Sequence, residues 1–141
     1  MTVSRRLLLL MAVTLMVALG SAESAAAQEE TTEGFSVEIV PNAKLLKSGA
    51  VRVDVRIACP LGKDVLEARV RVSQDEQTIS GESGIPVECT GKARTYRIVV
   101  TPLEGQFHTG TASSSAFVLV LDPATGTTEQ GSDTEPTLTV R

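Results

Sequence analysis

The sequence predicts an all-β fold, a single antiparallel β-sandwich of seven or eight short strands. Three observations support this prediction. Residues 50–59 and 66–73 alternate between apolar and polar side chains, which is the period of a half-buried strand. Turn clusters that contain glycine, proline and polar residues recur between short apolar runs. No segment after residue 27 repeats apolar residues at helical spacing over a useful length.

The first 27 residues read as a secretory signal peptide, which is removed from the mature protein. Arg5 and Arg6 form a basic start, residues 7–19 are an apolar run, and residues 25–27 supply an A-x-A cleavage signal. The apolar run is shorter than the roughly 20 residues that a membrane-spanning helix needs. We therefore expect a bacterial protein that is secreted or held in the cell envelope, without a membrane span in the mature chain. The arginine pair suits both the general and the twin-arginine export route.

Residues 28–34 are polar and acidic and are expected to form a flexible lead-in, whereas residues 35–141 form the sandwich domain. Besides the two alternating segments, strands are expected at 35–40, 78–80, 85–89, 94–101, 116–121 and 138–140. The alternation directs these side chains inward: Val51, Val53, Val55, Ile57, Cys59, Leu66, Ala68, Val70 and Val72.

The remaining positions of the domain divide into core aromatics and polar connections. Tyr96 and Phe117 have inward parity, which leaves Phe107 as the aromatic side chain expected to be exposed. The stretch 123–136 is rich in threonine, glycine and acidic residues, and it is expected to be a long loop that is disordered or functional.

The chain has two cysteines, Cys59 and Cys89, and both have inward parity. In an exported protein such a pair predicts one disulfide, here a tie through the core; free thiols are the alternative. A metal site would need more ligands than the single histidine, His108, can add, and the C-x-x-C spacing of a redox pair is absent. The sequence therefore predicts no metal site and no cofactor.

Several of these residues together carry a family resemblance. A strand ends in Cys59, the turn Cys89-Thr90-Gly91 precedes the strand that contains Tyr96, and FHTGTA at 107–112 precedes an apolar strand. This order resembles small exported immunoglobulin-like β-sandwich proteins of uncharacterised function from actinobacteria and related bacteria, over residues 50–121. The resemblance implies a sandwich fold and an exported location, and it brings no catalytic residue or ligand. Tyr96 stands where tryptophan is expected in these proteins.

The residue patterns of a serine hydrolase, a calcium-binding loop and a nucleic-acid-binding protein are incomplete or absent in this sequence. The serines of 79–85 do not form G-x-S-x-G, and His108 is the single histidine that could act as their base, so it is expected to be a solvated loop residue. Asp122, Asp133 and Glu135 could contribute to a weak calcium site, but no loop has EF-hand spacing. The net charge of −4 disfavours a nucleic-acid partner. We therefore expect a protein that is not an enzyme.

The outward positions carry five arginines: Arg52, Arg56, Arg69, Arg71 and Arg97. On one sheet they would form a basic stripe suited to an anionic cell-wall polymer, whereas an immunoglobulin-like strand order would split them between two sheets. A solvated, charge-balanced face is the alternative. The sequence predicts a secreted, non-enzymatic protein with a binding or structural role at the cell envelope or outside the cell. The competing hypothesis is an inhibitor or effector that acts on another protein through an exposed loop, 103–111 or 123–136.

Overall fold

The computed structural model describes residues 34–141, which form eight β-strands and no helix, so the predicted all-β class is confirmed. The predicted signal peptide (1–27) and almost all of the lead-in (28–34) lie outside the described residues. Within the described part, no helix is long and apolar enough to cross a bilayer. The strands are β1 (Ser36–Ile39), β2 (Asn42–Leu45), β3 (Val51–Ala58), β4 (Asp64–Gln74), β5 (Ile79–Gly84), β6 (Ala93–Val100), β7 (Gly110–Asp122) and β8 (Thr127–Val140).

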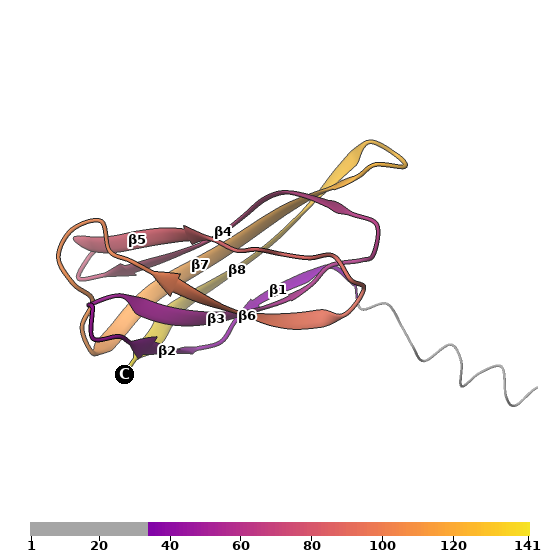
Figure 1. Cartoon of the computed structure of the whole chain (residues 1–141). Helices are drawn as coiled ribbons and strands as arrows, with labels where there is room; N and C mark the ends of the chain where they lie inside the picture. The colour runs from indigo at the N-terminus through magenta and orange to yellow at the C-terminus, as the bar shows by residue number, and fades with distance from the viewer. Residues whose placement is uncertain (1–33) are drawn as a thin grey trace, which may run out of the picture. The chain divides into compact units, whose positions relative to one another are not determined.

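The strands form one mixed sheet in the order β1-β3-β2-β8-β7-β4-β5, and β6 pairs with the remaining edge of β3 (Figure 1). Every pairing is antiparallel except that of β2 with β8, so the prediction of a purely antiparallel sheet is wrong at this place. At this place Pro41, which has no N–H, separates β1 from β2. Val40 still donates to the carbonyl of Asp54 on β3, whereas the Pro41 carbonyl accepts from Thr139 on β8.

The core is built from the alternating side chains of strands that lie far apart in the sheet. Figure 1 shows β3 and β6 on one side of the domain and β4, β5, β7 and β8 on the other. Inward side chains from both sides pack into one cluster, to which Tyr96 adds its ring as predicted. Each fully buried aliphatic side chain contributes about 1.5–3 kcal/mol, so this cluster is the main source of stability. Its fully buried members include Val51, Val53, Val55, Val70, Val72, Val100, Val118, Val120, Leu138 and Val140.

The alternation in β4 is interrupted by a β-bulge. The register with β7 shifts between Val65 and Glu67, so Leu66 does not follow the inward and outward alternation of the strand. Leu66 is 53% exposed. The prediction that Leu66 points inward is therefore wrong. After the bulge, Val70 and Val72 are buried as predicted, and Arg69 lies exposed on the opposite face.

The structure reverses the predicted positions of two phenylalanines. Phe107 is only 3% exposed, because its N–H donates to the Gly49 carbonyl and brings its ring into the core. Phe117 lies on the outer face of β7, with the Arg69 guanidinium 5.5 Å from its ring centroid. The alternation in the sequence could not show which face of β7 is buried, since residues 116–121 are apolar on both faces. The buried face is the one that carries Ala116 and Val118.

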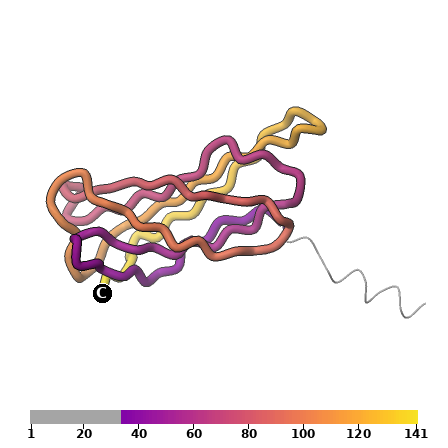
Figure 2. The backbone as a smooth tube through the Cα atoms, viewed as in Figure 1, coloured from indigo at the N-terminus to yellow at the C-terminus, as the bar shows by residue number. Residues whose placement is uncertain are grey.

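The stretch 123–136 is neither a long loop nor disordered, which corrects the prediction made from its composition. Residues 123–126 form the turn, and β8 then pairs with almost the full length of β7. Figure 2 shows this hairpin reaching beyond the other strands. Its inner positions are small or have a specific partner: Gly131 leaves room for the ring of Phe35, and Asp133 Oδ2 accepts from the Ile39 N–H at 2.7 Å. Pairing with β7 thus overrides a composition that is unfavourable for a strand.

The segment between β4 and β6 also differs from prediction. One strand, β5, replaces the strands expected at 78–80 and 85–89, and residues 85–92 are a connection without strand structure. β5 contains Gly81, whose missing side chain allows the Thr101 backbone to approach, so strand propensity gave little indication of this element.

The predicted disulfide between Cys59 and Cys89 is confirmed, with the two Cα atoms 4.5 Å apart. Its place differs from a tie through the core, because β3 and β6 are hydrogen-bonded neighbours. The bond instead fastens the connection 85–92 to the end of β3, where the Gly91 N–H also donates to the Cys59 carbonyl. Cys59 is buried, and Cys89 is partly buried against the core.

Candidate functional site

The structure divides the five predicted arginines between two faces. Arg52 and Arg56 lie on β3, and Arg97 on β6 is the direct partner of Asp54, so these three arginines share one outer face. Arg69 and Arg71 lie on β4, which pairs with β5 and β7 and not with β3. The single stripe of five arginines is therefore not formed.

Two further cations join the first group. Lys44 on β2 is the direct partner of Arg52 on β3, and Arg141 follows the end of β8, where its Nη2 donates to Asn42 Oδ1 at 3.0 Å. Neither residue was predictable as part of a site, because β2 is only four residues long and follows a proline. We call the outer face formed by these side chains the basic face: Lys44, Arg52, Arg56, Arg97 and Arg141.

Three cations elsewhere in the described domain form ion pairs with carboxylates: Arg69 with Glu67 at 2.9 Å and Glu82 at 3.9 Å, Arg94 with Glu88 at 2.6 Å, and Lys63 with Asp122 at 3.1 Å. Between residues 34 and 141, no such ion pair involves Lys44, Arg52 or Arg97. Asp54 lies opposite Arg97 and Glu38 lies opposite Arg56 on this face, so its five cations outnumber its carboxylates and give it a positive potential.

A pocket of about 300 Å³ opens on the basic face. Its lining comes from β2, β3 and the end of the chain: Asn42, Ala43, Lys44, Arg52, Asp54 and Arg141. Asp54 Oδ1 is buried and has no hydrogen-bond partner among the described residues. Leaving a buried acceptor unsatisfied costs about 1–3 kcal/mol, so the carboxylate of Asp54 is held in this cationic pocket at a cost to stability.

The connection between β6 and β7 holds His108, which was expected to be a solvated loop residue. Its side chain is half exposed, yet Nε2 lies 2.8 Å from Asp75 Oδ2 and Nδ1 lies 2.9 Å from the Thr109 carbonyl. The buried side chain of Gln74 fixes the loop by donating to the His108 carbonyl and accepting from the His108 N–H. Since both ring nitrogens face acceptors, the doubly protonated imidazolium fits this site best.

The pKa of His108 is raised above its ordinary value of 6.5, first by the hydrogen bond to the Thr109 carbonyl and then by the hydrogen bond to Asp75. A raised folded-state pKa gives stability that is fully present below pH 6.5 and is lost as the pH rises through the folded pKa. His108 is the single histidine of the chain, so its proton resonances follow this titration directly.

We expect the NMR titration of His108 to give a pKa above 6.5 and Asp75→Asn to lower it, because the substitution removes the negative charge beside Nε2. Glu76→Gln is the control, since Glu76 is in the same turn and contributes to no cause of the shift. A titration at or below 6.5 in the unmodified protein, or an equal decrease in both variants, would contradict this assignment.

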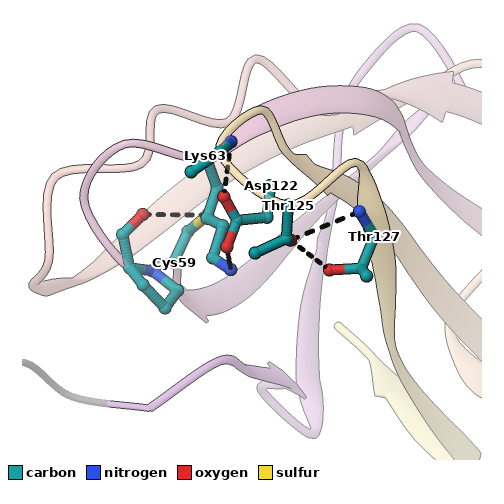
Figure 3. Close-up of polar contacts among 7 residues, drawn as sticks. Cys59, Lys63, Asp122, Thr125 and Thr127 are labelled. Carbon is teal, nitrogen blue, oxygen red and sulfur yellow. Dashed lines mark hydrogen bonds and ion pairs between the residues drawn. The ribbon is translucent and has the colours of Figure 1, made fainter.

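The acidic residues considered for calcium have separate partners. Asp122 accepts from Lys63 and from the Ala124 N–H, which lower the pKa of its carboxyl in that order, and Figure 3 shows this contact at the start of the hairpin turn. Asp133 holds β1, and Glu135 accepts from Thr137 at 3.0 Å. Within residues 34–141, no group of three His, Cys, Asp or Glu side chains could hold a metal ion.

The turn 75–78 contains an unusual backbone. Asp75, Glu76 and Gln77 all have positive φ, at 51°, 53° and 71°. Such conformations are unfavourable for residues other than glycine and are often found where a loop has a function. Leu103, in the neighbouring connection between β6 and β7, is 83% exposed. The turn 75–78 and the connection 101–109 therefore form the second candidate surface, which we call the loop end.

The basic face and the loop end are thus the two candidate sites, the first because of its clustered cations and the second because of its unusual backbone and its exposed leucine. Comparison of the chain with protein-family models, with curated proteins and with solved structures finds no match.

Proposed function

We propose that this protein is an extracytoplasmic, non-enzymatic binding protein, a β-sandwich of immunoglobulin-like topology whose basic face binds an anionic polymer of the cell envelope. The strand pairings support the topology. β1, β3 and β6 are neighbours, as are β5, β4, β7 and β8, which corresponds to the ABE and C′CFG groups of immunoglobulin-like sandwiches. The disulfide and the N-terminal pattern support export.

The observation that carries the binding function is a cation-rich face on an acidic protein. The chain has a net charge of −4, and residues 98–140 contain no lysine or arginine. The cations are therefore concentrated on part of the surface, and Lys44, Arg52 and Arg97 have no ion pair within the described domain. A localised positive potential of this kind attracts polyanions even though the protein as a whole is negatively charged.

The state of His108 supports a role without catalysis. Its two ring nitrogens are directed at the Asp75 carboxylate and the Thr109 carbonyl, so the imidazole that a serine nucleophile would need as a base already has two other partners.

Cosedimentation of the purified protein with isolated cell walls tests the proposal. We expect the protein to pellet at low salt and to be released at high salt, since surface charges are screened. Each cation near an anionic surface contributes about 1 kcal/mol, so R52Q/R97Q should bind about tenfold or more weakly. The matched control is R69Q/R71Q, which removes the same charge from β4 and should bind nearly as the unmodified protein does. Protein that stays in the supernatant, or equal losses in both variants, would contradict the proposal.

A second candidate is an inhibitor or effector that acts on another protein through the loop end. It is favoured by the exposure of Leu103 on a connection that the buried Gln74 holds in place. An exposed apolar side chain on a fixed loop is suited to a pocket of a partner. In a pulldown from the native culture, this hypothesis predicts a stable complex that Leu103→Asp abolishes and R52Q/R97Q leaves intact.

A further inference from the structure

The pocket on the basic face combines a carboxylate with cations, which a site for a simple polyanion does not need. We propose that it binds one unit of a phosphorylated polyol, with the phosphate on Lys44, Arg52 and Arg141 and a neighbouring hydroxyl donating to the Asp54 carboxylate where it lines the pocket. The inference rests on the proposed function, because it names the chemical class of the polymer that the basic face would bind.

The three cations of the pocket come from different elements and converge on one space. Lys44 and Arg52 are direct partners on neighbouring strands, and Arg141 reaches the same pocket from the end of β8. Asn42 Oδ1 accepts from Arg141 Nη2 at 3.0 Å and thereby orients the guanidinium. Guanidinium groups match the geometry of phosphate oxygens with two parallel hydrogen bonds, and an ammonium group adds a compact charge.

Asp54 determines what must lie beside the phosphate. It lies two residues from Arg52 on the same outer face of β3, and its buried Oδ1 has no partner in the described domain. An ionised carboxylate can only accept hydrogen bonds, so it repels a second anionic oxygen and is satisfied by a hydroxyl donor. A site built to bond a ligand hydroxyl discriminates strongly against the analogue that lacks it.

Two small phosphates of similar size provide the test by calorimetric titration. Glycerol 1-phosphate carries the hydroxyls, and propyl phosphate lacks them. We expect the unmodified protein to bind glycerol 1-phosphate about tenfold more tightly, the effect of one hydrogen bond to a charged group. Asp54→Ala should reduce this ratio to about one while propyl phosphate binds at least as well as before. Glu67→Ala, which removes a carboxylate from β4, should keep the ratio.

The folding of Asp54→Ala is checked by urea denaturation. A cooperative transition shows that the variant folds, although it loses both the unpartnered Oδ1 and the negative charge opposite Arg97. A ratio near one in the unmodified protein, or a ratio that Asp54→Ala leaves unchanged, would overturn the inference. Either result leaves cell-wall cosedimentation as an independent outcome, so failure of the pocket and failure of the proposed function are distinguishable.

The source of the polyol phosphate is tested in parallel. Soluble poly(glycerol phosphate) should compete with cell walls for the protein, and the competition should weaken in Asp54→Ala. Vesicles of phosphatidylglycerol present a similar headgroup on a lipid surface. Binding to the vesicles without binding to the polymer would overturn the polymer as the source.

Discussion

Replacing both cysteines, C59A/C89A, is expected to lower the free energy of unfolding by about 3.5 kcal/mol, because the disulfide closes a loop over a sequence separation of 30 residues. The bond restricts the unfolded chain, and in the folded protein it fastens the connection 85–92 to the end of β3. A loss of this size is a large share of the 5–15 kcal/mol that stabilises a typical domain. Urea denaturation of the oxidised protein and of the double variant measures it.

The control for this prediction is the unmodified protein after reduction, which keeps both sulfur atoms in place but opens the loop. It should lose most of the same free energy, and any remaining difference reports the packing of the buried Cys59 side chain. Two reactive thiols in the folded, oxidised protein, or a double variant as stable as the unmodified protein, would contradict the disulfide.

Gly81→Ala is expected to destabilise the protein by about 2–3 kcal/mol, the cost of inserting a group into a packed contact. A Cβ at this position would overlap the carbonyl oxygen of Thr101, which is backbone and cannot rotate away. The contact joins β5 to the segment after β6, where the Leu103 N–H donates to the Ser80 carbonyl at 2.8 Å. The substitution therefore tests whether the two free edges of the sheet meet, as closure into a sandwich requires.

Gly84→Ala in the same strand is the matched control for urea denaturation. A Cβ there would lie 3.8 Å from the Ala68 carbonyl oxygen, an ordinary contact, and its φ is not in the left-handed region. We expect a change within about 0.5 kcal/mol, as for other surface substitutions. Equal effects of the two substitutions would show that β5 and the segment 101–103 do not approach each other.

The sequence was sufficient for the elements in which one face is buried and the other is solvated. In β3, valines and isoleucine alternate with charged residues, so period, direction and burial follow from the pattern alone. The disulfide was predictable for the same reason, since the parity of β3 directs Cys59 inward.

The pattern was insufficient where burial is set by a distant partner. β8 contains few apolar residues and is held by its pairing with β7. The phenylalanines were misplaced because β7 is apolar on both faces, and because the loop that contains Phe107 is positioned by a hydrogen bond to Gly49. β2 follows Pro41 and pairs with β3 on one edge and, in parallel, with β8 on the other, a position that its four residues do not indicate.

The candidate site was predictable only in part. The outward parity of Arg52, Arg56 and Arg97 is visible in the sequence, but their separation from Arg69 and Arg71 depends on the pairing of β3 with β6. The pocket depends on still longer connections. Lys44 and Arg141 line the same pocket although they are almost 100 residues apart in the sequence. Asp54 differs from other surface acids only because its Oδ1 is buried without a partner in the described domain.

NMR chemical-shift mapping with soluble poly(glycerol phosphate) shows whether the basic face is the binding surface. We expect the amide signals around the basic face to shift during the titration and to return at high salt. These signals belong to Lys44, Arg52, Asp54, Arg97 and Arg141. Shifts centred on Arg69 and Arg71 or on the loop end, or no shifts at low salt, would contradict this expectation.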